Sequence, residues 1–490
     1  MKWKPEVDIY FSDFFQVPKR LVERYGAFDI SLVNDLPLFI DPFLLFNSRK
    51  RKYRHLHADI IRYLRFLRDE STAGRVDDGL LRARYTFKEI HQNWLGFART
   101  GNRGSGLGME FARALHSNLN SIFSSFGAEE ITTGSHLEKL CLIGSGVGRD
   151  HVSDFTTNLI KGFLLDYTQA FAFKHIAPRH RKRFAVEKVS FNYETETWAA
   201  GLFDLPAFRG EYVVLTPRDI LTKDEIWINK PELVSRFDEI VAGLPNESLR
   251  AELDSYLRKR LTKKAKQKEI NQARLEALRA YPELIEHYIK DKEDDGDRAT
   301  SVSAQRIHQS ELLYIEQVRP VAALLQTLGF YKTPGTTHEE AHKRISFLKD
   351  CIENKGCHKI FYVGGEPVGR EEDVHILFRL IWYGTSSDVS REVNDGRGPV
   401  DYRISRGAQD KTLVEFKLAS NSQLKRNLEH QGATYQRASG AGWCIKVILY
   451  RSKEEFAKVR NVLKDLKLSN DPDIVLIDAR RDNKPSGSKA

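Results

Sequence analysis

The sequence predicts an α/β protein in which a large, helix-rich N-terminal region of mixed α/β character precedes a C-terminal sheet covered by helices. Two observations favour this fold class. Residues 371–490 alternate strand-like and helical segments, an order that is typical of a sheet packed against helices. Residues 246–290 carry long helical patterns. A chain of 490 residues is long enough for two to four domains, at roughly 100–200 residues each.

We expect the chain to divide into four parts. Residues 1–245 form an accessory region of one or two domains, which we expect to sense a trigger or recruit a partner. Residues 246–305 are a long helical segment that ends in a charged linker without periodicity, and residues 306–370 are a helical connector. Residues 371–490, about 120 in number, are enough for a complete small domain.

The C-terminal part predicts eight elements in the order helix, strand, strand, strand, helix, strand, helix, strand. Runs rich in valine, isoleucine and aromatic residues mark the strands, and apolar residues at helical spacing mark the helices. In that order, the segments are residues 371–384, 388–394, 399–405, 412–419, 421–439, 442–450, 452–467 and 473–480.

Composition narrows the classes of function. The excess of 77 Lys and Arg over 67 Asp and Glu gives a net charge of +10, which favours a polyanionic partner such as nucleic acid. Four cysteines without a CxxC pair are typical of a reducing compartment. The N-terminal residues lack the apolar stretch of a secretory leader, and no window holds 18 uninterrupted apolar residues. We therefore predict a soluble, cytoplasmic protein that does not enter a membrane.

Two neighbouring strands carry charges where a buried strand normally has none. Asp401 lies in "PVDYRIS", and Glu415 and Lys417 lie in "TLVEFKLA". Because side chains alternate along a strand, Glu415 and Lys417 point to one face. The turn between the strands brings Asp401 to the same patch. Burying such charges without a function is costly, although an exposed edge with an ion pair is the simple structural alternative.

Two carboxylates on adjacent strands are a suitable site for a hard cation such as Mg²⁺, which prefers oxygen ligands and keeps bound waters. A lysine beside the ion can position a water for attack on a phosphodiester while the ion neutralises the charge on the phosphate. Residues 371–450 resemble the catalytic core of the PD-(D/E)xK, or restriction-endonuclease-like, nuclease superfamily. The resemblance rests on "GRGPVD", on "VEFK" and on the order of the elements.

The resemblance implies a restriction-endonuclease-like core with a mixed sheet, and an enzyme that hydrolyses phosphodiester bonds with Mg²⁺, for which Mn²⁺ can substitute. It implies Asp401 and Glu415 as metal ligands and Lys417 as the residue that positions the water. DNA is the favoured substrate over RNA, and restriction or anti-phage defence is the expected role. Many such nucleases act as dimers, so a homo-oligomer is also expected.

Other members of the superfamily carry further site residues on the flanking helices. A glutamate on the helix before the strands is implied, and either Glu371 or Glu372 can fill this place. Glu371 lies nearer the expected buried face of that helix. On the following helix, "HQGATY" supplies Gln431 as a catalytic residue and Tyr435 beside the bound strand. Three basic residues of the same helix are candidates for phosphate contacts, namely Lys425, Arg426 and Arg437.

Other interpretations remain open. The C-terminal domain is alternatively a degenerate nuclease fold that binds nucleic acid or assembles without cleaving it. Residues 338–342 match the HExxH pattern of zinc metalloproteases, in which His338 and His342 bind zinc and Glu339 is the base. A structural zinc held by some of His338, His342, Cys351 and Cys357 is a further alternative. Two glycine-rich segments lack GxxxxGK[ST], so nucleotide hydrolysis is not predicted.

Overall fold

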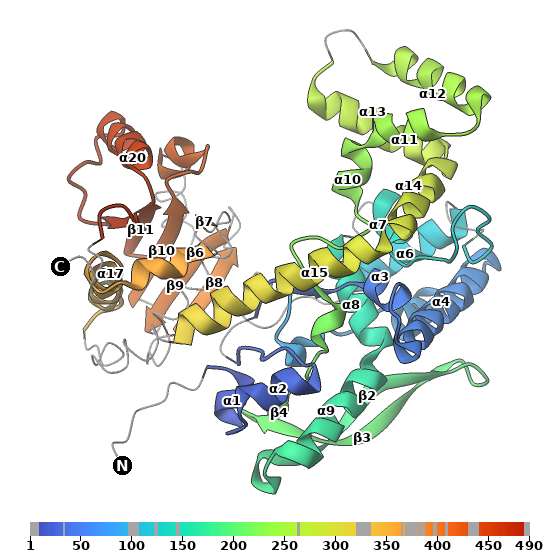
Figure 1. Cartoon of the computed structure of the whole chain (residues 1–490), viewed down its shortest axis with the longest axis horizontal. Coiled ribbons are helices and arrows are strands. Elements are labelled where there is room, and N and C mark those ends of the chain that lie inside the picture. The colour runs from blue at the N-terminus through green and yellow to red at the C-terminus, as the bar shows by residue number, and fades with distance from the viewer. Residues whose placement is uncertain are drawn as a thin grey trace.

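The structure of the protein is a computed structural model with a mixed α/β fold, as predicted, in which a C-terminal mixed sheet is flanked by helices (Figure 1). No helix of the described chain is long and apolar enough to cross a membrane. The structure describes residues 9–32, 35–96, 107–121, 126–143, 148–261, 265–319, 335–363, 366–367, 382, 388–394, 399–406, 410–429 and 441–484.

Helices dominate the N-terminal region, and two small sheets accompany them in the part of the chain that the structure describes. The strands are β1 (Leu38–Ile40) paired with β5 (Leu221–Lys223), and β2 (Arg181–Asn192), β3 (Thr197–Phe208) and β4 (Glu211–Tyr212) in a second sheet. The helices are α1 (Phe11–Phe14), α2 (Lys19–Tyr25), α3 (Pro42–Phe46), α4 (Arg51–Thr72), α5 (Asp78–Leu80), α6 (Met109–Ser121), α7 (Lys139–Ile143), α8 (Arg149–Leu159) and α9 (Lys161–His175).

The long hairpin of β2 and β3 is a feature that the sequence did not suggest. Its turn is held by Asn192, whose side-chain oxygen accepts hydrogen bonds from the backbone amides of Glu194 at 2.8 Å and Thr195 at 3.2 Å. Such a side-chain bond to the backbone two or three residues further on favours a tight turn. Helix α9 packs against β3 and covers one side of the hairpin.

The segment that we predicted as one long helix followed by a linker consists of separate helices throughout. They are α12 (Glu247–Arg260), α13 (Gln267–Ala280), α14 (Glu283–Asp294) and α15 (Gly296–Glu311), and two shorter helices, α10 (Lys230–Ser235) and α11 (Phe237–Gly243), precede them. Pro282 separates α13 from α14, because proline has no amide hydrogen to donate and disfavours helical geometry at the residue before it.

Residues 290–305, which we predicted as the linker, belong to α14 and α15 except for Asp295 between them. Helix α15 places small residues on one buried face, with Ala299, Ser303 and Ser310 each fully or almost fully inaccessible to solvent. These residues pack the helix against the N-terminal region, and this packing explains why a polar, charged stretch becomes helical. Figure 1 shows α15 extending from the N-terminal helices towards the C-terminal sheet.

The C-terminal sheet has the strand order β12-β11-β10-β9-β8. Strands β8, β9 and β10 pair antiparallel, whereas β10, β11 and β12 pair parallel. The strands lie where the sequence predicted them, within two residues at each end: β8 (Asp388–Asn394), β9 (Pro399–Arg406), β10 (Asp410–Leu418), β11 (Trp443–Tyr450) and β12 (Ile474–Asp478). Two further short strands, β6 (Tyr362–Val363) and β7 (Glu366–Pro367), form a separate pair.

Helices cover both faces of this sheet. Helix α17 (Thr337–Asn354) packs on the face that carries Val414 and Phe416, and it therefore belongs structurally to the C-terminal sheet. On the opposite face, Ile448 and Tyr450 pack against the helical residues 424–429 and against α20 (Lys453–Asp465). The burial of both faces is consistent with the continuous apolar run of β11.

Candidate functional site

The two charged strands separate at the residues predicted to form the site. The pairing of β9 with β10 runs from Asp410 opposite Arg406 to Val414 opposite Tyr402. Among the described residues, the β9–β10 ladder ends there, while β10 continues beside β11 as far as Leu418. We call this point the fork. It leaves the first residues of β9 and the last residues of β10 available for side-chain contacts.

Asp401 lies in the fork. One carboxylate oxygen, Oδ2, accepts a hydrogen bond from the backbone amide of Phe416 at 2.7 Å. The same oxygen lies 3.4 Å from the ammonium of Lys417. The carboxylate therefore replaces the backbone partner that a continued ladder would give to Phe416, and it draws Lys417 to the same place.

Glu415 is beside this pair and is almost completely buried, with 2% of its surface exposed. Its side chain shares a face with Lys417, because the two residues are separated by one position on a strand. Val414 and Phe416 point to the opposite face, into the core beneath α17. The structure thus places Lys417 next to Asp401, with Glu415 on the same face of β10 as Lys417, and the chemical roles of the three residues remain a prediction.

Lys446 is a site-facing residue that the sequence analysis missed. It lies opposite Glu415 in the parallel pairing of β10 with β11, so the two side chains share a face. Its ammonium donates a hydrogen bond to the carbonyl oxygen of Leu428 at 3.0 Å. The signal was present in "WCIKVILY", where one lysine interrupts an apolar strand in the same way as Glu415 does.

Cys444 lies on the same face, two residues before Lys446, and is buried. Burial raises the pKa of its thiol, and the negative charge of Glu415 raises this pKa further. Asp401 also contributes to the raised pKa, which places Cys444 within the electrostatic reach of the fork. A thiol with a raised pKa is a poor nucleophile, so Cys444 supports the site by packing and not by covalent chemistry.

Of the other residues predicted for the site, the structure describes only Lys425 and Arg426. Glu371, its alternative Glu372, Gln431, Tyr435 and Arg437 lie outside the described residues. Lys425 and Arg426 lie on the helical segment 424–429 and are exposed. The ammonium of Lys425 pairs with Asp465 of α20 at 2.7 Å, at a position where both side chains are more than half exposed. Such an exposed ion pair is weak and can be exchanged for a phosphate.

The arrangement at the fork suits a hard cation. Asp401 and Glu415 offer carboxylate oxygens, which are the ligands that Mg²⁺ and Mn²⁺ prefer. The burial of Glu415 supports this fit, because a carboxylate that is only 2% exposed requires positive charge nearby to remain ionised. Lys417 and Lys446 contribute ammonium groups on the same face. An ammonium next to two carboxylates can hold a water or an anionic reaction centre beside them.

The HExxH pattern does not bring its glutamate to the histidines. The Glu339 carboxylate accepts a hydrogen bond from the Thr336 amide at 3.0 Å, as in a capping box at the start of α17. His338 and His342 meet Asp473 instead. Cys351 and Cys357 interact with each other and are not part of that cluster. Asp473 precedes β12 and was not predicted, since nothing in its local sequence indicates a partner on α17.

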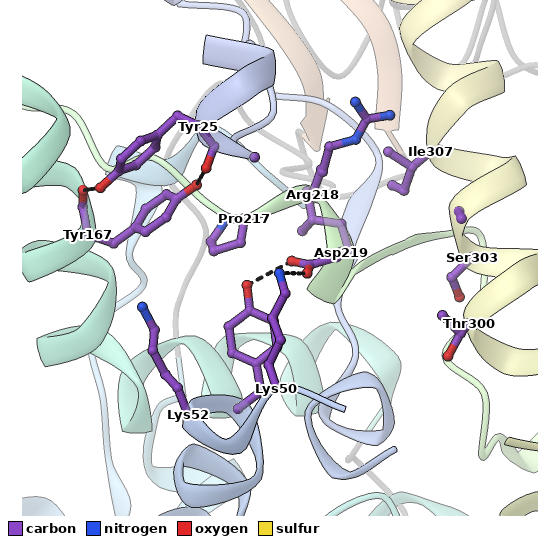
Figure 2. A pocket seen from close by; sticks show the side chains of 14 residues that line it. Tyr25, Lys50, Lys52, Tyr167, Pro217, Arg218, Asp219, Thr300, Ser303 and Ile307 are labelled. Atoms are coloured by element: carbon purple, nitrogen blue, oxygen red, sulfur yellow. Dashed lines mark hydrogen bonds and ion pairs between the residues drawn. The ribbon is translucent and has the colours of Figure 1, made fainter. Parts of the chain in front are cut away.

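The N-terminal region contains a cavity of about 460 Å³ at its contact with α15. Figure 2 shows Tyr25, Tyr167 and the basic residues Lys50 and Lys52 around it, and Tyr53 is a third tyrosine of the lining. The lining also includes Arg218, Asp219, Thr300, Ser303 and Ile307. A cavity of this size, with aromatic walls and a few polar groups, is typical of small-molecule sites.

The charges in this cavity are unequally matched. Asp219 pairs with Lys50 and accepts a hydrogen bond from the Tyr53 hydroxyl at 2.8 Å. Arg218 pairs with Glu311 at 2.9 Å. The Lys52 ammonium lies over the Phe163 ring, 4.3 Å from its centre. Burial lowers the pKa of Lys52, and the neighbouring charge of Lys50 lowers this pKa further.

Two family models match parts of the chain. Residues 16–229 match the family described as "Domain of unknown function (DUF8370)". Residues 337–453 match the family described as "Domain of unknown function (DUF8371)". The second match begins at the first residue of α17 and contains Asp401, Glu415 and Lys417, so one matched stretch includes both α17 and the fork. No curated protein and no solved structure matches the chain.

Proposed function

We propose that the protein is a metal-dependent nuclease that hydrolyses phosphodiester bonds, with DNA as its substrate. The observation that carries this proposal is the fork, where one oxygen of Asp401 is shared between the Phe416 amide and the Lys417 ammonium, next to Glu415. The strand order also supports it. The resemblance to the PD-(D/E)xK superfamily implies a mixed sheet, and β8 to β10 pair antiparallel whereas β10 and β11 pair parallel.

Each residue of the fork has a separate task in this proposal. Asp401 and Glu415 hold the divalent ion, which, when bound, neutralises charge on the phosphate and lowers the pKa of a bound water. The Phe416 amide fixes the orientation of Asp401 before any ligand arrives. Lys417 positions the attacking water and stabilises the negative charge that develops on the phosphate. Lys446 fixes the helical segment 424–429 next to Glu415 through its bond to Leu428.

The decisive experiment is cleavage of supercoiled plasmid DNA with Mg²⁺, with Mn²⁺ and with a chelator. The full-length protein is compared with Asp401→Asn, Glu415→Gln and Lys417→Met. Each substitution should lower the cleavage rate by at least about 100-fold, because each removes a group that acts in the reaction. A parallel assay with single-stranded RNA tests the choice of substrate.

A degenerate nuclease fold gives a different result in the same experiment. Wild-type protein and all three variants would then bind DNA with equal affinity, and none would cleave it with either ion. Protection from phage infection is a second readout for the proposed role in defence. Phage should form fewer plaques on cells that express the wild-type protein than on cells that express Asp401→Asn.

We also propose that a phosphate-bearing small molecule in the N-terminal cavity is the trigger of this nuclease. The supporting observation is Lys52, which lies over aromatic rings in a lining with more basic than acidic groups. Thr300 and Ser303 of α15 complete the lining, so a ligand there contacts the helix that leads to the C-terminal sheet.

Thermal unfolding with inorganic phosphate or AMP, at constant ionic strength, tests this trigger. The wild-type protein and Lys182→Met, which removes an exposed lysine of β2, should be stabilised equally. Lys52→Met should lose the stabilisation. An identical response of all three proteins would contradict the proposal and would leave the nuclease assignment unaffected.

A further inference from the structure

Two histidines at the start of α17 converge on a carboxylate that precedes β12. His338 Nε2 lies 2.7 Å and His342 Nε2 lies 2.8 Å from the same atom, Oδ1 of Asp473. The three atoms lie within 4.8 Å of one another. Residues four apart on a helix project from the same side, which is why both imidazoles reach one oxygen. We propose that His338, His342 and Asp473 bind a zinc ion that stabilises the C-terminal domain.

The donor atoms select the class of ion. Two imidazole nitrogens and one carboxylate oxygen are a common zinc donor set, whereas Mg²⁺ prefers oxygen ligands alone. Zinc in proteins is usually tetrahedral, so three side chains leave one position for water. The side chains of His338, His342 and Asp473 are 24%, 26% and 23% exposed, which gives an ion and a water access to the cluster.

The present distances are those of hydrogen bonds, and zinc requires a small rearrangement. With bonds of about 2.0–2.2 Å from zinc to nitrogen and oxygen, tetrahedral neighbours are about 3.3–3.6 Å apart. Each histidine nitrogen must therefore move away from the Asp473 oxygen by about 0.5–0.9 Å, which small side-chain rotations provide. The ion takes the place of the two protons that the imidazoles otherwise share with the carboxylate.

The backbone around the cluster is fixed independently of the ion. Trp443, the first residue of β11, stacks on His338 with ring centres 5.0 Å apart. The Asp473 amide donates to Asp471 at 2.9 Å, and the Asp473 carbonyl accepts from the Lys446 amide at 2.7 Å. When the ligands lie on a fixed backbone, little conformational entropy is lost when the ion binds.

The cluster is separate from the fork. Trp443 is opposite Thr412 in the pairing of β10 with β11, and Thr412 is hydrogen-bonded to Thr337 of α17. Both residues therefore belong to the face of the sheet that α17 covers. Glu415 and Lys417 point to the other face, because they are an odd number of residues from Thr412. An ion at the cluster consequently joins α17 to the edge of the sheet and does not take part in the reaction proposed for the fork.

The zinc content of the full-length protein tests this inference. The wild-type protein should retain about one zinc ion per chain after extensive dialysis, measured by elemental mass spectrometry. Asp473→Asn is the key variant, because its amide oxygen still accepts hydrogen bonds from the histidines but is a poor zinc ligand. We expect its zinc affinity, measured by competition with a coloured chelator, to be at least about 100-fold weaker.

Two controls make the result specific. Glu339→Gln alters the neighbouring residue of the HExxH pattern and should keep the wild-type zinc content, since Glu339 is part of the helix cap. Asp401→Asn should keep it as well, whatever its effect on DNA cleavage, so the zinc site and the nuclease can fail separately.

Thermal unfolding gives a second, independent measurement. Zinc added to chelator-treated wild-type protein should raise Tm, because an ion that binds only the folded state stabilises that state. Asp473→Asn should show no such rise. The inference is overturned if wild-type protein retains no zinc and its Tm responds to zinc no more than that of Asp473→Asn. Those outcomes would identify the cluster as hydrogen bonds alone.

Discussion

The Phe416 amide donates a 2.7 Å hydrogen bond to the Asp401 carboxylate across the point where β9 and β10 separate. This hydrogen bond contributes both to the stability of the strands and to the position of a proposed metal ligand. The Asp401 carboxylate accepts the hydrogen bond of the Phe416 amide at the point where β10 is no longer paired with β9. The same hydrogen bond holds the carboxylate in the position where it would bind a metal ion. The stability of the fork and its proposed activity therefore depend on different properties of one side chain.

Substitutions of Asp401 should separate these two properties. Asp401→Ala leaves the buried Phe416 amide without an acceptor, which should lower the free energy of unfolding by about 1–3 kcal/mol. Asp401→Asn keeps an acceptor oxygen and should cost less than about 1 kcal/mol. DNA cleavage should be lost in both variants, because an amide is a weak ligand for Mg²⁺.

Urea denaturation and plasmid cleavage, measured on the same preparations, check this prediction. An Asp401→Asn protein as unstable as Asp401→Ala would show that the charge of Asp401, and not its hydrogen bond to Phe416, maintains the fork.

The sequence predicted the C-terminal strands closely because each is a short apolar run bounded by turn residues. The charges of Asp401 and Glu415 were informative for the same reason, since a charge in an apolar run has few structural explanations. By contrast, residues 296–305, which form most of α15, were predicted as part of a linker. The buried face of α15 has a single large apolar residue, Ile307, among small residues such as Ala299 and Ser303, and only the neighbouring surface of the N-terminal region makes those small residues a packing face.

The cluster of His338, His342 and Asp473 could not be predicted in full from the sequence. His338 and His342 are recognisable by their spacing, but Asp473 lies more than 130 residues further on and reaches them only through the order of the strands. Lys446 is a different case. It meets the criterion that identified Glu415, and a search for isolated charges in every strand would have found it.

Cysteine labelling should follow the environments of the thiols. The Cys351 thiol donates to the sulfur of Cys357, so the pKa of Cys357 is lowered and that of Cys351 is raised. Burial and the charge of Glu415 raise the pKa of Cys444. Because the thiolate is the reactive form, iodoacetamide at pH 8 should modify Cys357 before Cys444 or Cys351. Mass spectrometry of the digested protein gives the three rates, and faster labelling of Cys444 would contradict its assigned burial.

Asp154 of α8 should make the N-terminal region less stable as the pH rises. Burial, followed by the charges of Glu89 and Asp150, raises the pKa of Asp154 to about 7. In the unfolded chain its pKa is about 3.9, so the folded state retains a proton that the unfolded state has lost between these values. The raised pKa of Asp154 therefore costs no stability at low pH, lowers stability progressively as the pH rises from about 4 to about 7, and lowers it by a constant amount above that.

Asp154→Asn removes this dependence. The variant should have a higher Tm than the wild-type protein at pH 8, by an amount that corresponds to about 1–3 kcal/mol, and a similar Tm at pH 4. Asp150→Asn, which removes one of the neighbouring charges from an exposed position, should give a smaller gain at pH 8. Equal Tm differences at both pH values would show that the carboxyl of Asp154 does not titrate in this range.

Glu340 should be essential for the stability of the C-terminal domain, whereas its neighbour Glu339 should not be. Glu340 and Arg344 are each 1% exposed, and the Arg344 Nε lies 2.8 Å from the Glu340 carboxylate. Arg406 of β9 pairs with the other oxygen of Glu340, so the carboxylate joins α17 to the sheet. Glu340→Gln leaves the buried charge of Arg344 uncompensated, which should cost about 3–5 kcal/mol.

Glu339→Gln is the matched control. It removes the same charge from the same turn of α17, so any effect on the helix dipole is equal in the two variants. Its side chain is exposed and glutamine also serves in a capping box, so its cost should be less than about 0.5 kcal/mol. Urea denaturation followed by tryptophan fluorescence measures both variants. A similar loss of stability in the two would mean that the charge of the turn, and not the buried pair of Glu340 with Arg344, holds α17 against the sheet.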